Sequence, residues 1–419
     1  MRAFLFLTLA SCTHDIAVYQ RVDVPTARDL DILYVFDNSS DRGNYDRMAS
    51  QLDVLQTRLG EIDGQVPNLH VGVVTTDLGS RGAGDAVPAP ATGNCAGDGQ
   101  AGQMMTFRGG GVPDGWFLED NRGPEGSRVR NFASNDLVVE LGVMTNPGPG
   151  VATTGCEFEQ PLEAMRRALD PDVNFGFLRP NAMLQVVFLT TEDDCSFATG
   201  ELLDPNNGTL GPLTSFRCTE QGVICDGDDN MRRPGARTNC RPRDGSRYMV
   251  DVGEYQTFLE QLKPDRNDVI VSAVAGARAP FEVMDVGQPV LAPSCQGAGG
   301  RATPAVRIGS IVDSFGGVLV DGCTQENAYQ QLTTPIVNRQ KACLANVTKA
   351  DGEDCRVIEK VGGTDTELAS CADGGAAPCW YIYTDAAACP GGENLGIAIR
   401  RGTATAPLSS RIEATCFVK

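Results

Sequence analysis

The sequence predicts an α/β fold in which a mostly parallel sheet is covered on both faces by helices. Several short runs are apolar at nearly every position, as expected of strands that are buried on both sides. Segments with one apolar helical face separate these runs, and such alternation places consecutive strands parallel in one sheet. Near residue 341 the character of the chain changes. Short strand signals and six cysteines after that point predict a small β-rich disulfide module.

The elements follow in order along the chain. The predicted strands cover residues 31–36, 70–75, 184–190, 269–276 and 318–320. Between them, apolar side chains recur at steps of three and four residues, which is typical of helices with one buried face. The predicted helices cover residues 45–59, 157–169, 250–263, 306–315 and 325–339.

Composition divides the chain into four predicted parts. They are a signal peptide (1–11), a tether (12–27), a doubly wound domain (28–340) and the small cysteine-rich β module (341–419). Two stretches rich in Gly, Pro and Asp interrupt the domain at about 79–135 and about 195–247. Loops of that length are uncommon unless they are functional or held in place, so we expect disulfide-stapled insertions.

The N-terminal residues resemble the signal peptide of a bacterial lipoprotein. Arg2 precedes a brief apolar run, and Leu9-Ala10-Ser11-Cys12 resembles the lipobox at which the signal is cut and Cys12 is lipidated. The alternative is an ordinary signal peptide with a chance cysteine. We expect general export followed by lipid anchoring to the envelope. By resemblance to enterobacterial sorting rules, a residue other than Asp after the lipidated cysteine, here Thr13, favours the outer membrane. No later apolar run approaches the ~20 residues of a membrane-spanning helix.

The cysteine count agrees with export. Lipidation of Cys12 leaves 14 of the 15 cysteines, an even number that suits an oxidising compartment. They fall into even local groups, although the sequence leaves their connectivity open. The net charge of −19 argues against nucleic acid as a partner.

Oxygen-bearing side chains gather where predicted strands end and where one helix begins. The first strand opens into Asp37, Ser39 and Asp41. Thr154 lies just before a helix, and Asp193 follows the strand at 184–190. Because the carboxyl ends of parallel strands meet at one edge of a sheet, we expect these loops to converge there. Hydroxyl and carboxylate oxygens are the ligands that hard divalent cations prefer.

This arrangement resembles the von Willebrand factor type A (VWA) domain, whose metal-ion-dependent adhesion site begins Asp-x-Ser-x-Ser. Asp37 and Ser39 match that motif, whereas Asp41 stands at its third position, and Thr191 occupies the usual place of the third-loop Asp. Within the family, the chain is similar to the disulfide-rich VWA lipoproteins of myxobacteria. The resemblance covers about residues 28–341 in the order of elements.

The resemblance implies a divalent cation, Mg²⁺ first with Ca²⁺ or Mn²⁺ as alternatives, held by Asp37, Ser39, Asp41, Thr154 and Asp193. It also implies a non-enzymatic adhesion module, in which the cation offers an open coordination position to an acidic residue of an extracellular or periplasmic protein. One alternative is a structural envelope lipoprotein with a degenerate site, where Asp37 and Asp193 only cap helices. Another is a hydrolase that uses the same carboxylates and a metal-bound water.

Catalysis that depends on an imidazole is disfavoured by the sequence. The chain has two histidines, His14 in the predicted tether and His70 at the start of a buried strand. A Ser-His-Asp or Cys-His site needs such a ring beside its nucleophile. The sequence therefore predicts a binding protein and no enzyme.

Overall fold

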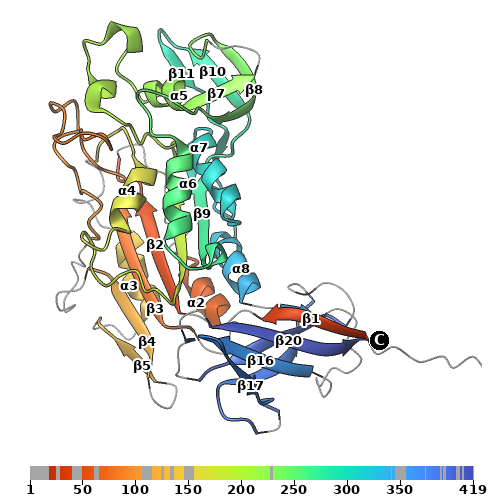
Figure 1. The fold of residues 1–419 in the computed structure, drawn as a ribbon. Coiled ribbons are helices and arrows are strands. Elements are labelled where there is room, and N and C mark those ends of the chain that lie inside the picture. The colour runs from red at the N-terminus through yellow and green to blue at the C-terminus, as the bar shows by residue number, and fades with distance from the viewer. Residues whose placement is uncertain are drawn as a thin grey trace, which may run out of the picture. The chain divides into compact units, whose positions relative to one another are not determined.

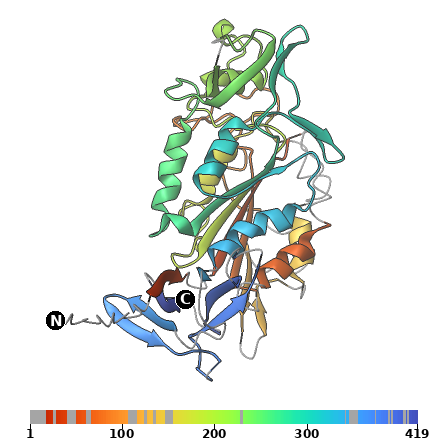
Figure 2. The ribbon, with the colours of Figure 1, turned by 90° about the vertical axis from the view of Figure 1, so that its right-hand side faces the viewer.

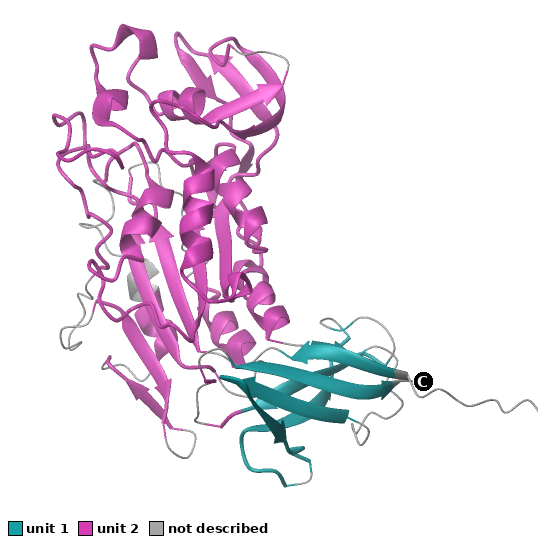
Figure 3. Ribbon diagram, viewed as in Figure 1, with its two compact units in different colours: residues 1–26, 341–400, 410–419 teal, residues 27–340, 401–409 magenta. Residues whose placement is uncertain are grey.

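In the computed structural model the chain forms two compact units (Figure 3), residues 27–340 with 401–409 and residues 1–26 with 341–400 and 410–419. The structure describes residues 18–24, 29–39, 50–60, 66–105, 116–123, 127–132, 136–145, 155–226, 230–340, 342–344, 355–372, 374–386, 389, 393–402, 406–407 and 410–418. Within these ranges, no helix has the length and apolarity needed to cross a membrane.

A seven-stranded sheet is the centre of the larger unit, with the spatial order β14-β9-β6-β2-β3-β4-β5 (Figure 1). The strands are β2 (Leu30–Phe36), β3 (Leu69–Thr75), β4 (Leu118–Arg122), β5 (Arg128–Arg130), β6 (Met183–Leu189), β9 (Val269–Ala275) and β14 (Leu319–Asp321). The five strands from β14 to β3 pair in parallel, and β4 pairs antiparallel with β3. Counted along the chain without the short β5, the order is 3-2-1-4-5-6, so the winding reverses between β2 and β6.

Helices cover both faces of this sheet (Figure 2). They are α2 (Leu52–Gly60), α3 (Leu137–Thr145), α4 (Pro161–Ala168), α6 (Val252–Gln261), α7 (Val306–Ser314) and α8 (Ala328–Arg339). Strand β2 shows how the two cores are divided. Ile32, Tyr34 and Phe36 pack with α2, α3 and α8, whereas Leu33 and Val35 pack with α4, α6 and α7. This alternation follows from the two-residue period of a strand, and it confirms the predicted doubly wound α/β class.

The first insertion contains regular structure that its sequence does not indicate. Residues 79–135 contribute β4 and β5 to the sheet edge. Strand β4 reads Leu-Glu-Asp-Asn-Arg, so it gives no apolar pattern. Its buried Asp120 is paired with Arg128 and Arg130, which stabilises this polar strand next to the edge.

The second insertion builds a small antiparallel layer beyond the carboxyl ends of the central strands (Figure 1). Its strand order is β11-β10-β8-β7. Its elements, with the short pieces nearby, are η2 (Gly200–Leu203), η3 (Gly208–Leu210), α5 (Phe216–Gly222), β7 (Val223–Asp226), β8 (Gly235–Pro242), β10 (Phe281–Asp285), β11 (Pro289–Leu291), β12 (Cys295–Gly297) and β13 (Gly300–Ala302). The short helix η4 (Arg266–Asp268) lies apart from them, directly before β9. The layer thus recruits β10 and β11 from beyond the predicted insertion at 195–247.

The smaller unit holds two antiparallel sheets with the orders β1-β20-β16-β17 and β15-β19-β18. Their strands are β1 (Val18–Val24), β15 (Ala342–Leu344), β16 (Cys355–Val361), β17 (Thr364–Leu368), β18 (Cys379–Thr384), β19 (Leu395–Arg400) and β20 (Arg411–Val418). Strand β1 comes from residues that the sequence analysis places in the tether. It pairs along its whole length with β20, at the far end of the sequence, so no local pattern indicates the pairing.

All the cysteines within the described ranges form disulfides, and each even local group, whose connectivity the sequence left open, pairs within itself. The pairs are Cys95–Cys156, Cys195–Cys218, Cys225–Cys240, Cys295–Cys323, Cys343–Cys389, Cys355–Cys416 and Cys371–Cys379. The proposed lipidation site Cys12 lies outside the described residues.

Candidate metal centre

The candidate site lies at the point where the winding of the sheet reverses. Asp37 directly follows β2, and its backbone N–H donates to the carbonyl of Leu189 at the end of β6, at 2.8 Å. The fully buried Asp37 carboxylate accepts the Ser39 N–H at 2.8 Å and faces the Thr190 hydroxyl at 3.4 Å. The carboxyl ends of β2 and β6 therefore hold one acidic side chain between them, in the crevice where doubly wound folds bind ligands.

A short loop before α4 brings a second buried carboxylate, that of Glu159, to the same place. The Gly155 N–H donates to the Asn38 carbonyl at 3.1 Å, the Gln160 N–H to the Thr76 carbonyl at 3.0 Å, and the Cys195 N–H to the Glu159 carbonyl at 2.8 Å. A Cβ at position 155 would collide with the Asn38 amide, so any larger residue there would have to displace that side chain. The loop is thereby tied to the ends of three strands.

These carboxylates repel one another inside the protein. Burial raises the pKa of Glu159 well above its usual value, and the charges of Glu192 and Asp37 raise it further, while the Ser39 side chain lowers it. Burial also raises the pKa of Asp37, against hydrogen bonds from Ser39 and Thr190. The largest charges acting on Glu159 are thus both negative. A bound cation would reverse this balance, because it favours the ionised form of each carboxylate.

Several buried oxygen atoms at the carboxyl ends of β2 and β3 and in the loop before α4 have no hydrogen-bond partner among the residues that the structure describes. They are Asn38 Oδ1, Thr75 Oγ1, Thr76 Oγ1, Glu159 Oε2 and Gln160 Oε1. Buried polar atoms are nearly always paired, so a group of unpaired ones indicates a ligand or water. Hydroxyl, amide and carboxylate oxygens are also the donor set of Mg²⁺ and Ca²⁺. The residues present therefore fit a hard divalent cation.

The predicted ligands are distributed unevenly. Asp37 and Ser39 lie together in the site, whereas Asp41 and Thr154 lie outside the described residues. The Asp193 carboxylate caps the N-terminus of α7, where it accepts backbone N–H groups of Val306, Arg307 and Ile308 at 2.9–3.1 Å. Burial raises the pKa of Asp193 to about 6, against these hydrogen bonds. Its role as a ligand stays a prediction, and the contacts favour the helix-capping alternative.

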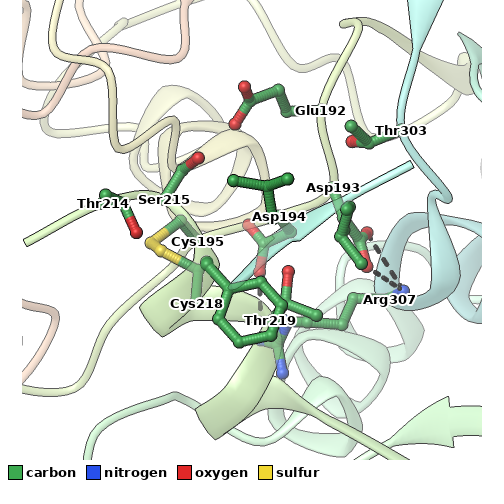
Figure 4. Close-up of a pocket in the computed structure, with 13 residues that line it drawn as sticks. Glu192, Asp193, Asp194, Cys195, Thr214, Ser215, Cys218, Thr219, Thr303 and Arg307 are labelled. Atoms are coloured by element: carbon green, nitrogen blue, oxygen red, sulfur yellow. Dashed lines mark hydrogen bonds and ion pairs between the residues drawn. A yellow bond between two sulfur atoms is a disulfide. The ribbon is translucent and has the colours of Figure 1, made fainter. Parts of the chain in front are cut away.

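Asp194, the next residue in the loop after β6, contacts two helices. It accepts the Leu162 N–H of α4 at 3.0 Å and forms a buried ion pair with Arg307 at 3.0 Å. Figure 4 shows Asp193 directed at the backbone of Arg307, Asp194 at its guanidinium, and Glu192 away from both. The three side chains line a pocket of about 170 Å³, with hydroxyl and apolar groups of the second insertion on its other walls.

Sequence reasoning missed Glu159 because it placed the helix start at residue 157. The helix begins at Pro161, and proline favours the first turn of a helix because it lacks an N–H to leave unpaired there. Pro161 was the signal that could have moved Glu159 into the loop before the helix.

A second group of possible ligands does not form a metal site. Cys295, Asp321 and Cys323 place ligand atoms within 4.8 Å of one another. However, Cys295 and Cys323 form a disulfide with each other. Since the thiolate is the metal-binding form of cysteine, this pair offers no ligand.

Comparisons with known proteins found matches among solved structures. No protein-family model matches the chain, and no curated protein matches it. One matching solved structure is a von Willebrand factor type A protein from Catenulispora acidiphila, at 11% identity and a TM-score of 0.26, covering 98% of this chain and 67% of that one. Another is the pilus adhesin from Streptococcus pneumoniae, at 10% identity and a TM-score of 0.28, covering 96% of this chain and 58% of that one. With scores this low, the fold class rests on the sheet order and the helices alone.

Proposed function

We propose that this chain is a non-enzymatic, VWA-like protein-binding module that uses a divalent cation at the carboxyl ends of β2 and β6. The sheet order, the position of the site at the winding reversal and the Asp37-x-Ser39-x-Asp41 motif support this assignment. The cation offers a coordination position to an acidic residue of an extracellular or periplasmic protein.

One observation carries the proposal: buried oxygen atoms without hydrogen-bond partners in the described structure lie in the same strand-end loops as Asp37, whose charge acts on the buried Glu159 carboxyl. Asp37 and Ser39 hold the cation, with Asp41 and Thr154 as further ligands. Mg²⁺ is the first candidate, and the carboxylate content of the site also suits Ca²⁺. The ion supplies a fixed positive charge that attracts the partner's carboxylate.

The position of His70 supports binding over catalysis. It lies at the start of β3, opposite Asp31 at the start of β2, whereas Asp37 follows the other end of that strand. Its Nδ1 lies 2.8 Å from the Phe177 carbonyl. This imidazole is therefore separated from the Asp37 carboxylate by the length of strand β2.

Lipidation at Cys12 displays the module on the bacterial envelope, in the outer membrane. The support is the lipobox-like sequence together with the disulfides, which suit an oxidising compartment. Mass spectrometry of the membrane fraction should find an acylated N-terminal Cys12. An unmodified N-terminus elsewhere would refute the anchoring.

A structural lipoprotein with a degenerate site is the second candidate, and the capping role of Asp193 favours it. Thermal unfolding of the wild type with and without Mg²⁺ or Ca²⁺ distinguishes the two. A cation that binds only the native state adds ~2.7 kcal/mol at about one hundred times Kd. We expect that gain in the wild type and in an exposed control, Asp172→Ala, and no gain in Asp37→Ala. Equal melting with cation and with chelator would leave the structural candidate.

A further inference from the structure

Glu159 is the acidic side chain whose surroundings are least explained by the protein alone. It is 2% exposed, and its Oε2 has no hydrogen-bond partner among the described residues. Its main chain is fixed by two hydrogen bonds, in which the Glu159 carbonyl accepts the Cys195 N–H and the Gln160 N–H donates to the Thr76 carbonyl. A carboxyl group is therefore held inside the protein by a rigid loop, without a visible reason in the fold.

The neighbours of Glu159 are the residues of the proposed cation site. The Ser39 side chain lies within hydrogen-bonding reach of its carboxylate, and Asp37 and Glu192 repel it. The Asn38 amide oxygen, 4% exposed and also unpaired, comes from the loop that carries Asp37 and Ser39. That loop accepts the Gly155 N–H, so two unpaired oxygens belong to two loops that are bonded to each other at the winding reversal.

We infer that Glu159 is an internal ligand of the cation and competes with the partner's acidic residue for one coordination position. This inference rests on the proposed function, since it assumes that a cation binds beside Asp37. Glu159 offers the same chemistry as the partner, a carboxylate, and the chain itself carries it to the site. The unliganded module is then self-closed, and a partner binds only by displacing the Glu159 side chain.

Thermal unfolding of Glu159→Gln in the full chain gives the first test. Without cation, the substitution replaces a buried carboxyl, whose charged form Asp37 and Glu192 disfavour, by a neutral amide, so the variant should melt above the wild type in EDTA. With saturating Ca²⁺ the order should reverse, because the wild type gains a ligand that the variant lacks. The control is Glu157→Gln, an exposed neighbour in the same loop, which should melt like the wild type in both buffers.

Europium(III) luminescence gives the second test, since lifetimes in H₂O and D₂O report the number of waters bound to the ion. Glu159→Gln should bind at least one more water than the wild type and should lose tenfold or more in Ca²⁺ affinity. Added acetate, standing for the partner's carboxylate, should displace water from the ion in Glu159→Gln and not in the wild type.

The outcomes separate the inference from the proposed function. Equal water counts and equal Ca²⁺ affinities for wild type, Glu159→Gln and Glu157→Gln would overturn the role of Glu159 and leave the cation site standing. A lower affinity in Glu159→Gln without any acetate effect would overturn the competition. A wild type that binds no cation would overturn both.

Discussion

Three buried aspartates show how differently this chain treats the same side chain. Asp31 accepts the Arg179 backbone and guanidinium at 2.8 Å and lies 3.6 Å from Lys263 Nζ. Asp193 accepts three backbone N–H groups of α7. Asp37 has hydrogen bonds from its own loop and from Thr190, and it repels Glu159. Buried charges need compensation, and among the described residues no cationic side chain acts on Asp37, which is why we propose a cation there.

His70 provides a pH prediction at the same scale. Burial of the ring, and after it the charge of Arg179, lowers the pKa of His70 to about 4. The ring is therefore neutral in the folded protein, where its Nδ1–H donates to the Phe177 carbonyl. In the unfolded chain it titrates near the ordinary value of ~6.5. Below that pH the unfolded state binds a proton that the folded state does not. Stability should therefore fall between about pH 6.5 and about pH 4 and level off below.

The measurement compares urea unfolding of the wild type and His70→Gln across this pH range. The wild type should lose roughly 1–3 kcal/mol more than the variant between pH 7 and pH 4. An NMR titration of the His70 ring should give the low pKa directly. A normal pKa in the folded protein would contradict the stated burial of the ring.

At the scale of elements, the sequence was a good guide wherever burial dictated the pattern. Strands β2, β3, β6 and β9 are apolar throughout because helices cover both their faces, and each lies within about a residue of its prediction. The polar strand β4 was not predicted, because ion pairs stabilise it and its sequence has no apolar pattern. Strand β1 was not predicted either, because its partner β20 lies at the far end of the sequence.

The site was predictable in part for the same reason. Asp37 and Ser39 follow a strand whose end the sequence marks clearly. The acidic run after β6 gives three carboxylates in a row, and local pattern does not say which of them turns toward a helix. The structure shows that Asp193 and Asp194 do so, and that Glu159 arrives from another loop.

The capping role of Asp193 gives a prediction for α7. Asp193→Ala should destabilise the larger unit by ~0.5–2 kcal/mol, the usual loss for a helix cap, because the N–H groups of Val306, Arg307 and Ile308 lose their acceptor. Cation affinity should stay at the wild-type value, measured by calorimetric titration. A large loss of affinity with little loss of stability would return Asp193 to the ligand set.

At the scale of the molecule, the chain consists of two units that differ in the size of their cores. The larger unit buries two hydrophobic clusters on either side of one sheet and also carries four disulfides. The smaller unit has one cluster, which includes Val357, Trp380 and Ile397, and it carries three disulfides. Small cores are usually insufficient alone, so covalent links contribute much of the stability there.

Removal of one link should therefore affect the smaller unit strongly. The Cys355–Cys416 disulfide joins neighbouring strands β16 and β20. Replacing both cysteines with alanine should lower the free energy of unfolding of that unit by ~2–5 kcal/mol. Calorimetry should show one transition moving while cation binding by the larger unit persists. Unchanged transitions would show that hydrophobic packing alone stabilises the smaller unit.

The most direct test of the central claim is a crystal structure of the full chain grown with Mn²⁺, with an anomalous difference map to locate the ion. The cation account predicts one peak at the carboxyl ends of β2 and β6, bonded to oxygens that include those of Asp37 or Ser39. A map without a peak there, or with its peak at Asp193 instead, would contradict it.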